Sequence, residues 1–223
     1  MRAMRRYLIL TLVFPLLALG LMTGCGQRIE STPEAAPIPE PMSDWGSHWD
    51  EAVKLHRAGE FYAALTEYDT ALELMPKDSS MIAILAGTNI SKGECCLMLF
   101  DGWQAQMCSR EASYYLEQAT EYEKQGFAWN LMSSQALLIN VASLIYIPGN
   151  EGQYPYQEAK ELLERLLKTQ MPEVTYFLGI VNDKLSNYEK AKSEFEDFIS
   201  APDELVTFLS GDTMRERAKE WLE

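Results

Sequence analysis

The chain has 223 residues and carries 19 basic against 33 acidic side chains, which gives a formal charge of −14. A chain of this length forms one or two domains. Negative charge of this size repels the phosphates of nucleic acids, so we expect no nucleic-acid partner. Hydrophobic residues make up 47% of the chain, enough for a folded core, whereas four cysteines are too few for a disulfide-rich scaffold.

The sequence lacks the residue patterns of the common catalytic and metal sites. Its two histidines, His48 and His56, have no cysteine or carboxylate at the spacing of a zinc site. It contains no phosphate-binding glycine loop, no nucleophile elbow and no pair of catalytic carboxylates with supporting residues. We therefore expect a protein that is not an enzyme and that has no metal, no catalytic residue and no cofactor.

The N-terminus has the layout of a secretory signal. Three basic residues, Arg2, Arg5 and Arg6, precede an apolar run over residues 7–22. A membrane span needs about 20 apolar residues, and Pro15 interrupts a run that is already short. This segment therefore predicts export rather than a transmembrane helix.

The apolar run ends in the sequence Leu21-Met22-Thr23-Gly24-Cys25, which resembles the lipobox of bacterial lipoproteins. The resemblance implies that residues 1–24 are a signal peptide and that Cys25 carries diacylglycerol and fatty acyl groups. Such a lipid anchor holds a protein on a membrane without a transmembrane helix. The alternative is an ordinary secretory peptide or an uncleaved anchor in which Cys25 is incidental. No aspartate follows Cys25, which favours the outer membrane, facing the periplasm, over the inner membrane.

Residues 25–44 combine this cysteine with a proline-rich tether. Pro33, Pro37, Pro39 and Pro41 alternate with acidic residues, and large apolar side chains are few. Proline-rich segments favour an extended conformation of about 3.1 Å per residue, so the tether reaches up to about 60 Å from the lipid.

Residues 45–223 have the pattern of an all-α domain, because apolar residues recur at helical spacing. Segments 80–100, 109–124 and 127–147 follow this pattern without further sequence signature, and residues 203–223 predict a terminal helical cap. One complete apolar stripe consists of Leu65, Tyr68, Ala71, Leu72 and Met75.

Within residues 45–78, the segment from Gly59 to Pro76 resembles the second half of a tetratricopeptide repeat (TPR). In that family a small residue ends the first helix and an aromatic residue opens the second. An alanine, an aromatic residue, a second alanine and a proline then follow at fixed intervals. This chain fills all six positions, with Gly59, Phe61, Ala64, Tyr68, Ala71 and Pro76.

Two later units resemble the repeat in part. Over residues 136–170 the match rests on Ala159 and the leucines that follow it. Over residues 172–202 Leu178 and Gly179 supply the signature of the first helix. The second helix of that unit matches at Tyr188, Ala191 and Phe195.

The TPR resemblance implies a right-handed superhelix of helical hairpins with a concave surface that binds peptides or proteins. Residues 79–135 carry no clean repeat signature, so we expect the superhelix to be irregular in the middle. The alternative is an irregular helical bundle that contains one repeat-like hairpin by chance.

Three cysteines remain if Cys25 carries lipid. A disulfide from Cys95 or Cys96 to Cys108 would suit an exported protein. The alternative is three buried thiols that act as small hydrophobic side chains.

The central segment is rich in methionine and aromatic residues, which suggests either a ligand or partner surface or ordinary helix packing. The residues considered for such a surface are Met98, Phe100, Trp103, Tyr115 and Trp129.

Together these features predict a membrane-anchored lipoprotein of the cell envelope that acts as an adaptor or scaffold for an envelope protein or peptide. The combination of lipobox, acidic helical-repeat body and irregular middle also resembles the lipoproteins that accompany tripartite carboxylate transporters. That resemblance implies the alternative function, an accessory component of a solute transporter that binds a small hydrophobic ligand or a periplasmic binding protein.

Overall fold

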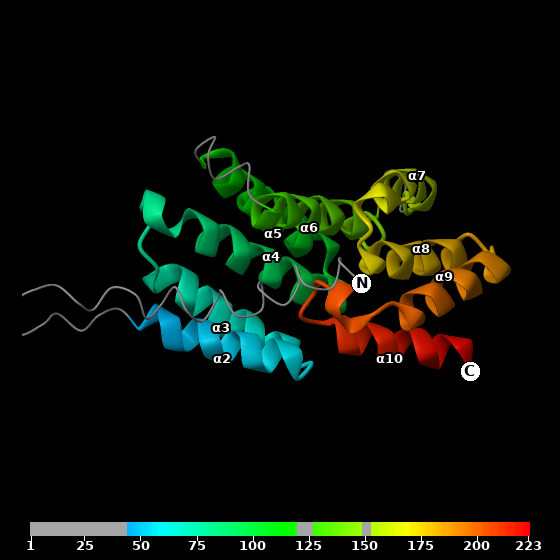
Figure 1. Ribbon diagram of the computed structural model, residues 1–223, viewed down its shortest axis with the longest axis horizontal. Coiled ribbons are helices and arrows are strands. Elements are labelled where there is room, and N and C mark those ends of the chain that lie inside the picture. The colour runs from blue at the N-terminus through cyan, green and yellow to red at the C-terminus, as the bar shows by residue number, and fades with distance from the viewer. Residues whose placement is uncertain (1–43, 120–126, 149–152) are drawn as a thin grey trace, which may run out of the picture. The chain divides into compact units, whose positions relative to one another are not determined.

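The computed structural model describes residues 44–119, 127–148 and 153–223. The predicted signal peptide, Cys25 and the tether up to residue 43 lie outside the described residues. Within the described ranges the chain forms nine α-helices and no strand (Figure 1). Neighbouring helices pack against one another along the chain, so the prediction of an all-α fold built from helical hairpins is confirmed.

Helices that follow one another in the sequence also lie next to one another in space. The most extensive packing is between the two helices of each hairpin. The first hairpin is α2 (Trp45–Arg57) and α3 (Phe61–Leu74), and the second is α4 (Ile82–Met98) and α5 (Gly102–Glu117). They are followed by α6 (Phe127–Ser143), α7 (Tyr156–Leu166), α8 (Pro172–Lys184), α9 (Tyr188–Ser200) and α10 (Gly211–Leu222).

Helix α5 begins at Gly102, seven residues before the predicted start at Ser109. The side chain of Asp101 caps this end by accepting a hydrogen bond from the Gln104 amide at 3.0 Å. The irregularity expected in the middle lies in α6, which packs against both α4 and α5.

Three hairpins end their first helix with the same turn. A residue in the left-handed region occupies each turn, with φ of 78° at Gly59, 62° at Phe100 and 60° at Ser186. The next amide donates to a carbonyl five positions back, as from Asp101 to Cys96 at 2.8 Å. This is the Schellman motif, a common helix C-cap. The left-handed conformation that it requires is less favourable in free energy for a residue other than glycine, because of the Cβ atom.

The shared turn places the α4–α5 hairpin in register with the hairpins α2–α3 and α8–α9. Each hairpin has a buried small residue seven positions before the turn residue and a buried alanine five positions after it. The sequence pattern missed this hairpin because its turn residue, Phe100, is large. The small residues are Ala52, Gly93 and Gly179 before the turns and Ala64, Ala105 and Ala191 after them.

Most residues predicted to pack between the repeats lie in the core. Those that are at most 6% exposed are Phe61, Ala64, Tyr68, Ala71, Ala159, Leu178, Ala191 and Phe195. Pro76 is exposed, and Tyr188 is 58% exposed at the first residue of α9, so both lie largely outside the core. The handedness of a superhelix and membership of the TPR family stay predictions.

The C-terminal segment ends in a helix that covers the last hairpin, as expected for a terminal cap, and it also reaches the middle of the domain. Helix α10 packs against α8 and α9 (Figure 1), while hydrogen bonds join its neighbourhood to α4. The Leu209 amide donates to the Glu94 carboxylate at 2.9 Å, and the Arg217 guanidinium donates to the Met98 carbonyl at 3.1 Å. Helix α10 therefore links the second hairpin to the last one.

Buried polar groups explain why this segment folds back. The Glu173 carboxylate on α8 is completely buried and accepts hydrogen bonds from the Thr207 hydroxyl at 3.0 Å and the Phe208 amide at 2.7 Å. His56 lies 3.5 Å from Glu94, and both are buried. Burial raises the pKa of both glutamates and lowers that of His56 to about 4. The segment supplies donors that the buried carboxylates need.

Candidate functional site

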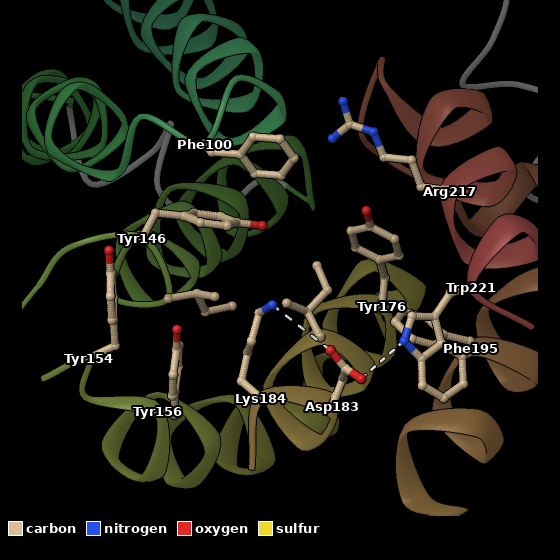
Figure 2. Close-up of a pocket in the computed structure, with 12 residues that line it drawn as sticks. Phe100, Tyr146, Tyr154, Tyr156, Tyr176, Asp183, Lys184, Phe195, Arg217 and Trp221 are labelled. Carbon is tan, nitrogen blue, oxygen red and sulfur yellow. Dashed lines mark hydrogen bonds and ion pairs between the residues drawn. The ribbon is translucent and has the colours of Figure 1, made fainter. Parts of the chain in front are cut away.

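A cavity of about 490 Å³ lies where the second hairpin, the end of α6, and helices α7 to α10 meet (Figure 2). A volume of this size is typical of sites for small molecules or for a few side chains of a partner. Its walls are mostly aromatic. The aromatic lining residues are Phe100, Tyr146, Tyr154, Tyr156, Tyr176, Phe195 and Trp221, and we call this cavity the aromatic cleft.

One wall of the aromatic cleft comes from the turn between α4 and α5, the end of the segment that follows α6, and the start of α7. The rings of Phe100 and Tyr146 meet edge to face with centroids 5.4 Å apart. Tyr154 and Tyr156 stack in parallel at 5.4 Å with an interplanar angle of 8°. The left-handed conformation at Phe100 holds its ring outside the core, where it is 60% exposed. This wall presents flat apolar surface with phenol groups at its edge.

The opposite wall comes from α8, α9 and α10. The rings of Phe195 and Trp221 pack at 5.0 Å, and Tyr176 lies 5.9 Å from Phe195. The Trp221 indole donates to the Asp183 carboxylate at 3.1 Å, as the dashed line in Figure 2 marks. Lys184 lies 4.0 Å from the same carboxylate group. Asp183 is therefore largely satisfied by groups of the cleft itself.

Arg217 adds positive charge to the aromatic cleft. Its guanidinium lies over the Phe100 ring at 5.1 Å from the centroid and donates to the Met98 carbonyl, so its position is fixed (Figure 2). Burial raises the pKa of Tyr176, which keeps this phenol neutral at physiological pH. Among the described residues, two cations, Arg217 and Lys184, and one carboxylate, Asp183, line the cleft. The described lining is thus locally positive in a chain of charge −14.

A second cavity of about 460 Å³ shares Phe100 and Tyr146 with the aromatic cleft. Helices α3, α4 and α5 supply the rest of its lining, which includes the exposed ring of Trp103. Two thiols, Cys96 and Cys108, also line it, so we call it the thiol cavity.

The structure separates the residues that the sequence proposed for a ligand or partner surface. Phe100 lines both cavities, and Trp103 lines the thiol cavity with 59% of its surface exposed. Met98 and Trp129 are 1% and 8% exposed and belong to the core. Tyr115 is half-buried and lines neither cavity.

Most of the aromatic cleft was missed at the sequence level. Tyr176, Arg217 and Trp221 look like ordinary helix residues in the sequence, because their spacing shows no common face. Tyr154 and Tyr156 flank a proline after a turn-rich segment, which was the one local signal available.

The three cysteines of the domain are buried free thiols. Cys96 on α4 and Cys108 on α5 both line the thiol cavity, so the α4–α5 hairpin brings these two thiols to one place. Cys95 is 0% exposed and lines neither cavity. A disulfide to Cys108 stays a prediction.

Among the described residues, histidine, cysteine and carboxylate side chains do not gather in groups of three or more that could hold a metal. In the same residues, every helix is too short or too polar to cross a bilayer. The chain matches no protein-family model, no curated protein and no solved structure.

Proposed function

We propose that this chain is a lipid-anchored protein of the cell envelope whose helical domain binds a peptide segment of another envelope protein. The observation that carries the binding part is the aromatic cleft of about 490 Å³. The lipobox-like sequence at Cys25 supports the anchor, and the proline-rich tether supports a domain held away from the membrane. The domain acts as a non-enzymatic adaptor.

The chemistry of the aromatic cleft indicates its occupant. Aromatic walls bury apolar and aromatic side chains well, and tyrosine hydroxyls at the rim hydrogen-bond to a peptide backbone. Arg217 favours a carboxylate in the occupant, and Lys184 adds a second positive charge. Among the described lining residues the one carboxylate, Asp183, already accepts a hydrogen bond from Trp221. The proposed ligand is therefore an apolar peptide segment that carries an acidic side chain or a carboxyl terminus.

Site-specific photo-crosslinking in the native envelope tests the binding site. A photo-reactive amino acid replaces Tyr154, which is 44% exposed in the aromatic cleft, or Tyr114, which is 62% exposed on α5 and lines neither cavity. We expect one protein adduct at position 154 and none at position 114. Equal adducts at both positions, or none at 154, would contradict the proposal.

Charge removal tests how the acidic group is recognised. Lys184→Met removes a cation from the aromatic cleft, and Lys168→Met removes another exposed cation outside it. We expect the first change to weaken partner binding about two- to fivefold and the second to leave it unchanged. A similar effect of both variants would mean that only the net charge of the domain matters.

Fractionation tests the anchor independently. We expect Cys25→Ser to move the protein from the membrane to the soluble fraction while the helical circular dichroism signal stays the same. A variant that stays in the membrane fraction would refute lipidation at Cys25.

A second candidate function is that of a solute-transport accessory that binds a small hydrophobic carboxylate. The cavity volume favours it, because about 490 Å³ falls within the usual range for small-molecule sites. Native mass spectrometry of protein purified from its own envelope distinguishes the two. A bound small molecule that is lost in a Tyr156→Ala variant would favour the accessory function over the adaptor.

A further inference from the structure

The thiol cavity brings two cysteines from the two helices of one hairpin to the same surface. Cys96 on α4 is 4% exposed and Cys108 on α5 is 5% exposed, and both side chains line the cavity. Cys95 is adjacent in sequence, yet it is completely buried and does not line the cavity. The hairpin therefore separates one thiol pair that a reagent can reach from one thiol that it cannot.

The two helices approach closely at this point because Gly93 lies one turn before Cys96 on α4. A Cβ atom at Gly93 would lie 3.5 Å from the Cβ of Cys108 and 2.9 Å from a methyl group of Ile139. The space for a side chain at Gly93 is thus taken by α5 and α6. This close approach brings Cys96 and Cys108 to the lining of one cavity.

Charge distinguishes the two sulfurs. The neighbouring Cys96 thiol and the positive charge of Lys92 lower the pKa of the Cys108 thiol, whereas burial and the carboxylates of Glu111 and Asp69 oppose them. The neighbouring Cys108 thiol and burial raise the pKa of Cys96. Lys92 also lines the cavity and is held there by an ion pair with Asp69. A cation at the cavity thus favours the thiolate of Cys108 over that of Cys96.

We propose that Cys96 and Cys108 form a redox pair that closes to a disulfide by exchange with an external disulfide that enters the thiol cavity. The Cys108 thiolate attacks one sulfur of the external disulfide, whose S–S bond breaks and releases a thiolate. Cys96 then loses its proton and attacks the Cys108 sulfur of the mixed disulfide, which releases the second thiolate. Two electrons pass to the external disulfide, and the two protons of the cysteines go to the thiols released.

The proposal is independent of the proposed adaptor function, since it depends on geometry within one hairpin. It also chooses between the two pairings that the sequence left open. Cys95 is excluded because it is 0% exposed and does not line the cavity, and because burial next to Glu94 raises the pKa of its thiol.

The test uses the full-length chain with Cys25→Ser, so that every remaining thiol belongs to the helical domain. The folded protein is incubated with excess oxidised glutathione, quenched with acid and alkylated. Cleavage before Asp101 separates Cys108 from the other two cysteines, and fragmentation then distinguishes Cys95 from Cys96 by mass spectrometry. We expect a single intramolecular disulfide between Cys96 and Cys108, with Cys95 alkylated.

Matched variants make the outcome decisive. Cys95→Ser should form the same disulfide at a rate within about twofold of the parent, because Cys95 takes no part in the exchange and both reacting sulfurs are unchanged. Cys96→Ser should stop at a mixed disulfide of Cys108 with glutathione. Lys92→Gln removes the cation and should raise the pKa of the Cys108 thiol. Each pKa unit of that increase should slow the reaction about threefold, because fewer thiolates form although each is more nucleophilic. A bond between Cys95 and Cys108, or three alkylated thiols in the folded parent, overturns the proposal.

Discussion

The substitution Gly179→Ala tests the close packing of α8 against α9. A Cβ atom at this position would lie 2.6, 2.8 and 2.9 Å from three carbon atoms of the Phe195 ring. That ring is 3% exposed and lies between Tyr176 at 5.9 Å and Trp221 at 5.0 Å. To accept the methyl group, either this ring must shift out of its packed position or the two helices must separate.

The control is Gly87→Ala in α4, where a Cβ atom would meet nothing within 4 Å. Replacing glycine by alanine inside a helix stabilises it by about 1 kcal/mol. This gain applies to both positions, whereas overpacking costs about 1–3 kcal/mol and applies only at Gly179. The difference in unfolding free energy between the two variants is therefore expected to be about 1–3 kcal/mol.

Urea denaturation followed by far-ultraviolet circular dichroism measures this difference. The comparison holds if both variants keep the wild-type m value, the slope of unfolding free energy against urea concentration. Phe195→Leu removes the ring that the new methyl group meets. In that background Gly179→Ala should lose most of its cost, which a double-mutant cycle detects as coupling. If Gly179→Ala were as stable as Gly87→Ala, the close packing described here would be refuted.

Three further perturbations test other parts of the domain. Gly102→Ala would place a methyl group 2.6 Å from the backbone carbonyl oxygen of Ser143, which cannot rotate away, so we expect a loss of at least about 2 kcal/mol in urea denaturation. Glu173→Ala leaves buried amides of the C-terminal segment without their acceptor; we expect a loss of about 2–4 kcal/mol and faster hydrogen exchange in that segment, and unchanged exchange would contradict the link. His56 has a pKa lowered from 6.5 to about 4, so it contributes stability above pH 6.5 that is lost as the pH falls towards 4, by up to about 3 kcal/mol. Glu94 and Glu173 act in the opposite sense, since their raised pKa values make stability fall as the pH rises above 4.5. The difference between the wild-type and His56→Gln profiles gives the contribution of the histidine together with its coupling to Glu94, 3.5 Å away.

The helical hairpins could be predicted from the sequence because their causes are local. Helical spacing of apolar residues, and the small residues that let two helices approach, act between neighbouring segments of the chain. Gly59 and the buried residues Ala64 and Tyr68 lie where the repeat-like pattern places them. The second hairpin escaped this pattern because Phe100 takes the left-handed turn position that glycine occupies in the first.

The candidate site depended on the tertiary structure. Phe100, Tyr154, Tyr176 and Arg217 come from segments far apart in the chain, and each has an ordinary local role that hides its contribution to the aromatic cleft. The C-terminal segment joins these parts because buried carboxylates such as Glu173 need hydrogen-bond donors. The sequence pattern of the segment is compatible with several conformations, so it does not predict this one.

The sequence by itself determined the helical class, the basic hairpin unit, and the signals that predict export and lipidation, because each depends on residues within one or two turns of one another. The tertiary structure decided which aromatic side chains are exposed, which two thiols line one cavity, and against which helices α10 packs. These properties depend on the free energies of contacts between distant segments, which cannot be inferred from the spacing of residues within one segment.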